Sequence, residues 1–458
     1  MLTTLKTNIT YISAIGFHAA LGILIYFNEN IAKLYFFCAV FYFIYRIINA
    51  ADSSRTYEVL KACAYFVGAE VFFRTTRGAI SYEAGKYMVI VFILIGIFYK
   101  GLSGKGYPYF IYLMFLVPSI FVASTTLSFD ANFRTNIAFV LSGPVCLGLA
   151  ALFCYDKRVS QQQMSQIMLF MVLPIIAHTA YVYFYTPNLR DVLSSTASNR
   201  DAAGGWGANQ VSAALGLGMF IMAVRLFTKS PSLALKLLNA TLLGLISFRA
   251  VTTMSRGGVL AAILAILVFL LYYYRHSRAK KRNEVIAIFG LFCISLVMTW
   301  FVSINQTDGL VNLRYANKDH LGREKAGITT GRAELFEEEL EGFVASPFWG
   351  IGSSRAKDQR KEEEGQGVTS HSEFSRTLAE HGIFGVIILL ILIFKPLEMR
   401  AKNRGNYYFY AFLAFWFLTI NHMSMRIAMP AFIYGLALLN VTHDKRPIHR
   451  KPLKNPAD

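Results

Sequence analysis

VLAAILAILVFLLYYY, residues 259–274, contains no charged residue and no alternation of polar with apolar side chains. A membrane-spanning barrel strand needs short alternating segments, so this stretch excludes a barrel and predicts a helix. A helix of roughly 20 apolar residues crosses the hydrocarbon core of a bilayer. Because similar blocks recur along the chain, the stretch predicts one of many transmembrane helices.

The composition supports the same fold class. The 458 residues are 55% hydrophobic and only 16% charged, whereas soluble domains contain about 25% charged residues. We therefore predict an all-α, polytopic transmembrane bundle of about 12–14 spans. The apolar blocks lie at roughly 9–27, 31–48, 57–73, 87–99, 109–124, 137–154, 164–185, 211–227, 236–254, 258–274, 285–303, 383–395, 407–420 and 426–440.

The basic residues predict the orientation. The formal net charge is +18, which in a soluble protein would suggest a nucleic-acid partner. Here the three densest clusters, 275–282, 395–404 and 443–454, each follow an apolar block, as cytoplasmic loops do. We expect no nucleic-acid partner and place both termini in the cytoplasm. The external segments are then 74–86, 125–136, 186–210, the turn near Ser255, 304–382 and 421–425.

The external segment 304–382 is the longest of these and divides the chain into three parts. It holds 14 of the 27 acidic residues but only 10 of the 45 basic ones. A loop of this length is usually functional or disordered, and we expect it to be the catalytic loop between the spans of 1–303 and those of 383–458. Residues 332–344 predict an amphipathic helix on the bundle roof, and 355–367 predict a solvated, mobile segment.

A histidine in this loop is the candidate general base. Ser370 and Glu373 form a capping-box pattern, which places His371 at the first position of a helix. The positive end of the helix dipole disfavours an imidazolium, so His371 should stay neutral and accept a proton from a hydroxyl. A histidine beside a helix cap is more often structural, and the spacing alone does not decide between the two roles.

Two arginines near the turn at Ser255 are candidate anion ligands. Arg249 and Arg256 are seven residues apart, which predicts one shared helix face near the outer membrane surface. A guanidinium fork suits the oxygens of a diphosphate, and Gly257 and Gly258 allow a ligand or helix to approach closely. Snorkelling of either arginine to the interface is the structural alternative.

Further cations lie on the predicted external side, where the positive-inside tendency does not explain them. An anionic lipid-linked substrate would explain them, although each is equally compatible with a solvated loop. No Asp-x-Asp pair occurs, so a carboxylate-bound divalent metal has no obvious site, and we expect no metal. The additional cations are Arg74, Arg77, Lys86, Arg134, Arg190, Arg200, Arg314, Arg323 and Arg332.

Several motifs resemble those of the O-antigen ligase and polymerase superfamily of bacterial membrane glycosyltransferases. His371-Ser372 is followed by nine residues, then Gly382, two residues and Gly385. The Arg-x-x-x-Leu pattern after a serine is matched by Ser255, Arg256 and Leu260. Gly331-Arg332 and SPFWGIG, residues 346–352, follow in the same order. The resemblance covers 245–395.

The resemblance implies an inverting, metal-independent transfer of a glycan from a polyprenyl diphosphate to an acceptor hydroxyl. It implies that Arg256, Arg249 and Arg332 hold the diphosphate and that His371 acts as the base, with Ser255, Gly257, Gly258, Ser372, Glu373, Gly382 and Gly385 in supporting roles. The expected partners are the lipid-linked donor, a glycan or glycolipid acceptor and membrane lipids. No cofactor is expected. The expected location is the bacterial inner membrane, with the active site on the periplasmic side.

Three hypotheses stay open at this point. The first is a transferase, either a ligase or an O-antigen or exopolysaccharide polymerase. The second is a flippase or transporter of lipid-linked oligosaccharides, which would show two related halves and charges deep in a central cavity. The third is a membrane scaffold, which leaves the arginine and histidine motifs unexplained.

Overall fold

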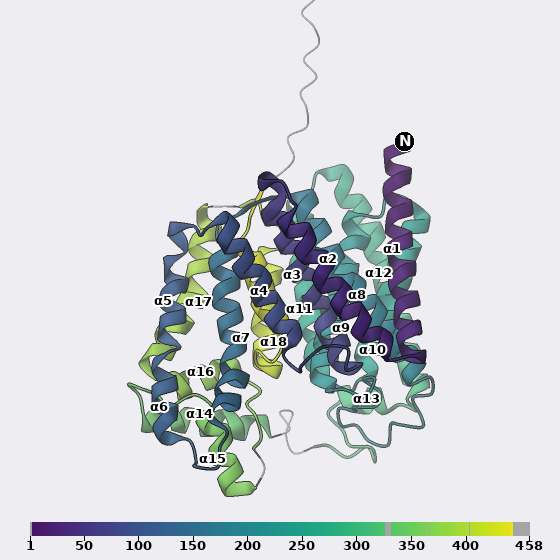
Figure 1. Ribbon diagram of the computed structural model, residues 1–458. Helices are drawn as coiled ribbons and strands as arrows, with labels where there is room; N and C mark the ends of the chain where they lie inside the picture. Colours follow the sequence, from purple (N-terminus) through teal and green to yellow (C-terminus); the bar gives the residue numbers. More distant parts are fainter. Residues whose placement is uncertain (1, 326–330, 366, 403, 443–458) are drawn as a thin grey trace, which may run out of the picture.

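The computed structural model describes residues 2–325, 331–365, 367–402 and 404–442. Helices dominate, and each of the two strands in the described part of the chain has three residues. Figure 1 shows the long helices packed side by side as a bundle. The all-α prediction is confirmed.

The helices and strands follow one another along the chain with mostly short connections. Their bounds are α1 (Leu2–Phe27), α2 (Asn30–Ile48), α3 (Asp52–Thr75), α4 (Ala84–Lys100), η1 (Gly104–Gly106), α5 (Tyr107–Phe115), α6 (Pro118–Thr126), α7 (Phe133–Cys154), β1 (Arg158–Ser160), α8 (Gln161–Tyr185), α9 (Ala208–Thr228), α10 (Leu233–Thr252), α11 (Arg256–Arg275), α12 (Ala279–Gln306), α13 (Leu310–Tyr315), α14 (Arg332–Ala345), α15 (Arg355–Glu364), α16 (Glu373–His381), α17 (Ile383–Lys402), α18 (Phe409–Met423), α19 (Ala428–Ala437) and β2 (Asn440–Thr442).

Each apolar block of the sequence forms mainly helical structure, but the helices differ in length and polarity. Among the described residues, nine segments are long and apolar enough to cross a membrane, one of them running from Gly104 to Thr126 through η1, α5 and α6. The other blocks form the shorter or more polar helices α3, α4, α17, α18 and α19. α3 is more polar because it carries charged residues that pair inside the bundle, such as Arg74 with Glu70 at 2.6 Å.

The predicted external segments meet at one end of the bundle, the lower end in Figure 1. The main-chain nitrogen of Ser128 donates to Asp358 at 2.7 Å, and Arg74 donates to the main-chain oxygen of Arg426 at 3.1 Å. These bonds connect segments that are hundreds of residues apart in sequence. Helices α13 to α16 lie at the same end.

The opposite end carries the described parts of two basic clusters and the small sheet. β1 and β2 pair in parallel, and Lys157 Nζ donates to the main-chain oxygen of Lys100 at 2.8 Å. The cluster at 275–282 begins at the last residue of α11. The cluster at 395–404 begins within the last turns of α17. The third cluster, 443–454, lies outside the described residues.

Close helix contact at the centre of the bundle depends on small residues. α9 is almost entirely buried, with 94% of its most apolar window inside the protein. A Cβ on Gly216 of α9 would lie 2.3 Å from the main-chain oxygen of Gly258 on α11, and one on Gly258 would lie 2.3 Å from the main chain of Ser212. Small residues let membrane helices approach this closely, and the contact holds the start of α11 against α9.

Two segments of the external loop differ from their predictions. α14 forms where the amphipathic helix was predicted, but its apolar residue Val344 is exposed, whereas Glu339 is only 1% exposed. Residues 355–364, predicted to belong to a solvated segment, form α15 with Asp358 and Arg360 buried. Arg360 is buried because it pairs with Glu339 at 3.1 Å, and Asp358 is buried because it accepts hydrogen bonds from the 125–136 segment.

Replacing Gly216 by alanine should destabilise the protein. The added methyl would overlap the main chain of Gly258, and overpacking of this kind costs about 1–3 kcal/mol. Gly290→Ala on α12 is the matched control, because a Cβ there meets nothing within 4 Å. Thermal unfolding of the detergent-purified variants tests this, and equal midpoints for the two variants would contradict the tight α9–α11 contact.

Candidate functional site

The turn between α10 and α11 separates the two arginines that the sequence placed on one face. α10 ends at Thr252 and α11 begins at Arg256, and Met254 between them has a φ of 59°. The prediction of a shared helix face for Arg249 and Arg256 is therefore wrong, because the helix breaks between them. The predicted turn near Ser255 is present.

Ser255 belongs to a hydrogen-bonded chain rather than to a helix cap. Its hydroxyl makes no cap bond but donates to Asn209 Oδ1 at 2.7 Å and lies 3.1 Å from His422 Nε2. Arg332 Nη1 lies 3.0 Å from His422 Nδ1. Arginine only donates hydrogen bonds, so Nδ1 of His422 accepts and Nε2 carries the proton that Ser255 receives. His422 is thus neutral and occupied on both ring nitrogens.

Three arginines converge beside this chain. Arg256 Nη1 donates to the main-chain oxygen of Arg314 at 3.4 Å, and Arg314 Nε donates to the main-chain oxygen of Met254 at 2.9 Å. Burial, and then the neighbouring Arg256, lower the pKa of Arg332 and of Arg314. Arginines nevertheless stay charged in proteins. Three cations at close range create a strongly positive potential that favours an anion between them.

A cavity of about 710 Å³, which we call the site cavity, brings these groups together. A volume in this range suits a small-molecule or headgroup ligand. Five of the side chains that the resemblance implicated line it, together with several that the sequence did not single out; the five are Ser255, Arg256, Arg332, His371 and Ser372. Its polar lining includes Asn209, Ser255, Arg256, Arg314, Tyr315, Arg332, Ser370, His371, Ser372, Asn421 and His422.

His371 lies just before α16 rather than in its first turn. The N-cap is Ser372, whose hydroxyl accepts from the main-chain nitrogen of Ser375 at 3.3 Å. The predicted capping box at Ser370 is therefore wrong, because the Ser370 hydroxyl instead donates to Glu339 at 3.0 Å and to the main chain of Ser372. The main-chain oxygen of His371 accepts from Ser424 at 3.1 Å, which ties this segment to the α18–α19 turn.

The imidazole of His371 is held in the neutral form. Burial lowers its pKa to about 4, assisted by the positive charges of Arg426 and Arg332. The expected neutral state is thus explained by burial and arginine charge rather than by the helix dipole. The Nδ1 atom is buried and has no hydrogen-bond partner among the described residues. Nδ1 of His371 can therefore accept a proton from a ligand. Nδ1 of His422 cannot, because it already accepts a hydrogen bond from Arg332.

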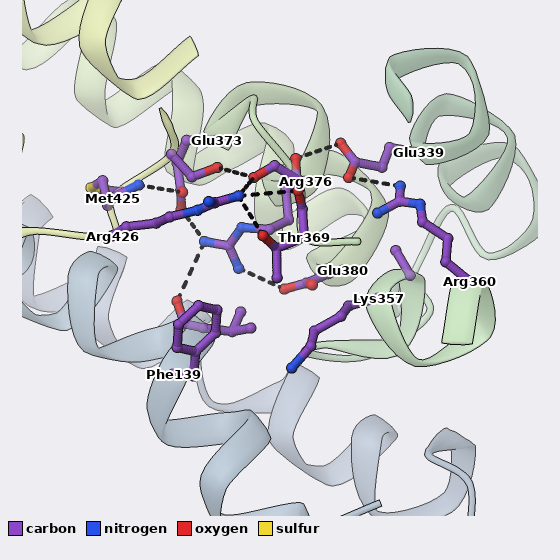
Figure 2. Close-up of a pocket in the computed structure, with 14 residues that line it drawn as sticks. Phe139, Glu339, Lys357, Arg360, Thr369, Glu373, Arg376, Glu380, Met425 and Arg426 are labelled. Carbon is purple, nitrogen blue, oxygen red and sulfur yellow. Dashed lines mark hydrogen bonds and ion pairs between the residues drawn. The ribbon is translucent and has the colours of Figure 1, made fainter. Parts of the chain in front are cut away.

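Glu373 lies behind the site cavity in a network of buried ion pairs (Figure 2). It pairs with Arg376, which also bonds Glu380 at 2.8 Å, and it accepts from the main-chain nitrogen of Met425 at 3.1 Å. Burial raises the pKa of Glu380 to about 7 despite its arginine partner. Glu373 lines a second, small cavity of about 30 Å³ rather than the site cavity, and it joins α16 to the α18–α19 turn.

The motif glycines are required by close packing. A Cβ on Gly257 would lie 2.1 Å from the ring of His422, and one on Gly385 would lie 2.1 Å from the main chain of Thr377. Gly382 has a φ of 58°, and its Cβ would overlap the main chain of Gly350. The absence of a side chain at these glycines lets His422 and α16 pack closely against their neighbours, so their role is structural.

Arg249 lies in a different place from the other arginines. Only 2% exposed, it donates to the main-chain oxygen of Thr186 at 2.9 Å, and its guanidinium carbon lies 4.1 Å from the ring centroid of Tyr183. It lines a separate cavity of about 690 Å³ between α10 and α12. The structure therefore does not bring Arg249 together with Arg256.

Several other external cations have acidic partners of their own. Lys86 pairs with Glu83 at 2.5 Å, and Arg190 pairs with Asp308 at 3.0 Å. Of the external cations named from the sequence, Arg314 and Arg332 line the site cavity. The Gly331-Arg332 motif marked Arg332 in the sequence, whereas Arg314 is distinguished from the other cations by its tertiary position.

His422 and Asn209 line the site cavity but were not singled out in the sequence, and Arg314 was named only as one of nine external cations. His422 follows the apolar block 407–420 and lies in the predicted external segment 421–425. A histidine at the external end of a predicted span is the sequence feature that could have indicated a site residue here. Asn209 begins α9, and Arg314 is one of many external arginines. Nothing local in the sequence shows that Ser255 would contact two of them.

The fold and the site cavity define a multi-pass membrane protein with a cationic cavity at one end of its bundle. Residues 240–390 match the family model described as O-Antigen ligase, and this region contains Arg256, Arg332 and His371. The match confirms the resemblance of this part of the chain to the O-antigen ligase and polymerase superfamily. It supports a ligase- or polymerase-type transfer of glycans. A search of curated proteins found no match.

The protonation of His371 gives a direct test of the site electrostatics. We expect a midpoint near pH 4, measured by NMR of histidine-labelled protein. As the pH falls, the unfolded chain takes up a proton on His371 before the folded protein does. The free energy of unfolding should therefore decrease as the pH is lowered from 6.5 to 4. Arg426→Gln should raise the midpoint by removing a nearby positive charge.

Arg323→Gln is the control for this experiment, because Arg323 is in the same external segment but pairs with Asp319 at 2.7 Å. Its His371 midpoint should equal that of the unmodified protein. A midpoint that does not rise in Arg426→Gln would show that the arginine charge does not act on the imidazole.

Proposed function

We propose that the protein transfers a glycan from a polyprenyl-diphosphate donor to an acceptor hydroxyl in the site cavity, by an inverting mechanism that requires no metal. The observation that carries this proposal is the convergence of Arg256, Arg314 and Arg332 with His371 in one cavity. Guanidinium groups bind phosphate oxygens through charge-assisted, often bidentate hydrogen bonds. A neutral imidazole in the same cavity supplies a base.

In the proposed step, the acceptor oxygen attacks the anomeric carbon of the donor sugar. The new carbon–oxygen bond forms as the bond to the diphosphate breaks, and the diphosphate leaves with the bonding electron pair. The proton of the acceptor hydroxyl passes to His371. A direct displacement of this kind inverts the anomeric configuration, and no nucleotide is needed because the donor already carries its leaving group.

His371 is better suited to the role of base than His422. His422 Nδ1 accepts a hydrogen bond from Arg332, and its Nε2 faces the Ser255 hydroxyl. The pKa of about 4 makes His371 a weak base in the ligand-free protein. A bound diphosphate would offset the positive charge of Arg332 and raise the pKa of His371, so the base would strengthen when the donor is present.

The arginines would act on the leaving group. Negative charge on the diphosphate grows as the glycosidic bond breaks, and positioned cations in a site with little water stabilise that charge. Arg256 and Arg332 reach the cavity from α11 and α14. Arg314 would add a third cation, and the Ser255–His422 chain holds Arg332 in position.

The proposed location follows from the distribution of charge. The basic clusters at 275–282 and 395–404 lie, in their described residues, at the end of the bundle opposite the site cavity, and such clusters favour the cytoplasm. We therefore propose a bacterial inner-membrane protein with both termini in the cytoplasm and the site cavity on the periplasmic side. In this arrangement 304–382 act as the catalytic loop between the spans of 1–303 and those of 383–458.

A ligase that attaches the glycan to a glycolipid acceptor is the favoured form, with a polymerase that joins repeat units as the alternative. Both would use the same donor and the same base. A flippase is the alternative from another class. The convergence of Arg256, Arg314 and Arg332 with His371 in one cavity at an end of the bundle favours a transferase over a flippase.

Purified protein with a polyprenyl-diphosphate oligosaccharide tests the activity. Lengthened chains would identify a polymerase, and glycan on an added glycolipid acceptor would identify a ligase. His371→Ala should lower the transfer rate by at least about 100-fold, since general base catalysis contributes about 10²–10⁴-fold. His320→Ala is the control, because His320 is an exposed histidine of the same external segment and should leave the rate unchanged.

Full activity in His371→Ala would remove the base assignment. Movement of the donor across a bilayer without any transfer of glycan would favour the flippase instead.

Arg256→Lys should be severely impaired in the same assay. A lysine keeps the charge but cannot form the paired hydrogen bonds of a guanidinium fork, and one lost charge-assisted bond corresponds to about 10–100-fold. Arg190→Lys is the control, because Arg190 is an exposed external arginine paired with Asp308. An active Arg256→Lys variant would support the view that Arg256 only extends to the membrane interface.

A further inference from the structure

A third large cavity lies at the end of the bundle opposite the site cavity. Its volume is about 680 Å³, and it lies between α1, α8, the end of α9 and the first turns of α10 and α12. We call it the α1–α9 cavity. Arg225, which lines it, is 16 residues after Asn209 of the site cavity along α9, or about 24 Å at the rise of an α-helix. The two cavities are therefore separate.

Arg225 is the central polar group of this cavity. It is only 6% exposed, and its guanidinium carbon lies 4.2 Å from the ring centroid of Tyr11. Its Nε is buried and has no hydrogen-bond partner among the described residues, and no ion pair of Arg225 occurs in that part of the chain. A buried charge of this kind needs a partner, and stacking on a tyrosine ring leaves the Nε–H donor unsatisfied.

The charges around Arg225 favour an anion. Lys229 and Lys281 also line the cavity and are exposed at its rim. Glu284 is the acidic residue among the described lining, and it lies 3.6 Å from Lys236. Positive charge therefore exceeds negative charge in the lining, and the buried cation lies deeper than the two lysines.

The walls of the α1–α9 cavity are mainly apolar. Leu169, Phe170 and Leu173 of α8 form one side, and Phe227 and Leu235 lie on the other. A free inorganic anion would leave these walls facing water. An amphiphile with a phosphate at one end and hydrocarbon at the other would satisfy both the buried arginine and the apolar walls.

We propose that the α1–α9 cavity binds the headgroup phosphate of an anionic glycerophospholipid from the leaflet at the basic end of the bundle. Arg225 donates to the phosphate, the two rim lysines attract it, and the upper part of an acyl chain lies along α8. Basic pockets between membrane helices bind anionic lipid headgroups in this way. The inference does not depend on the proposed transfer reaction, because none of these residues lines the site cavity.

Such a lipid would join peripheral helices to the core. α12 is among the most exposed helices, with 22% of its most apolar window buried, whereas α9 is central. A phosphate held between Arg225 of α9 and Lys281 of α12 would connect the two. Bound lipid should therefore raise the thermal stability of the protein.

The experiment uses the full chain, purified in detergent and stripped of lipid. Phosphatidylglycerol, phosphatidylcholine and inorganic phosphate are added separately, with bound lipid counted by native mass spectrometry and stability followed by thermal unfolding. We expect phosphatidylglycerol to bind and to raise the unfolding midpoint. Phosphatidylcholine and inorganic phosphate should do neither at the same concentration.

Two variants test the residues. Arg225→Gln should weaken phosphatidylglycerol binding by about tenfold or more, the size of one lost charge-assisted hydrogen bond. Lys281→Gln should weaken it less, and because Lys281 is exposed this variant keeps the test usable if Arg225→Gln does not fold. Arg275→Gln is the control. Arg275 ends α11 at the same end of the bundle and is an exposed cation, but it does not line the cavity.

Weakened binding in Arg225→Gln or Lys281→Gln, with unchanged binding in Arg275→Gln, supports the proposal. Equal binding of phosphatidylcholine overturns it, because the headgroup charge would then not be recognised. Stabilisation by inorganic phosphate as large as that by phosphatidylglycerol overturns the lipid as occupant. Equal weakening in all three variants overturns the site, because a diffuse surface charge would then explain the binding.

Discussion

The site depends on one hydrogen-bonded chain that runs from Asn209 through Ser255 and His422 to Arg332. These four residues come from α9, the α10–α11 turn, α18 and α14, so the chain joins elements that are far apart in sequence. Each polar group in it has a defined donor or acceptor role, because arginine only donates. That constraint makes His422 neutral and places a cation beside the site cavity.

Two kinds of helix contact make this chain possible. Gly258 lets α11 approach the main chain of α9, and Gly257 leaves room for the His422 ring. Behind α16, the ion pairs of Arg376 with Glu373 and Glu380 hold the α16 segment against the α18–α19 turn. Burying these paired charges costs desolvation free energy. In return, the fixed α16 segment gives His371 a defined position beside Arg426 and Arg332.

The same physical problem is solved differently at the two ends of the bundle. At the site end, three arginines share one cavity with a neutral imidazole, and a diphosphate would neutralise them. At the other end, Arg225 lies under an apolar-walled cavity with two lysines at its rim, and a single phosphate on a hydrocarbon chain would suffice. At the site end the expected anion is marked by three converging guanidinium groups. At the other end it is marked by one buried guanidinium whose Nε has no hydrogen-bond partner among the described residues.

The sequence by itself determined the helical class and the apolar blocks, and its short motifs singled out His371 and Arg256 as candidates, because hydropathy and motifs are local properties. It also predicted which segments share an end of the bundle, since alternating spans require it. Only the tertiary structure decided that Arg249 lies apart, that Glu339 faces inward and that His422 contacts Ser255. Those facts depend on a helix break at Met254 and on helix crossings permitted by glycines, which bring together residues with no local pattern in common.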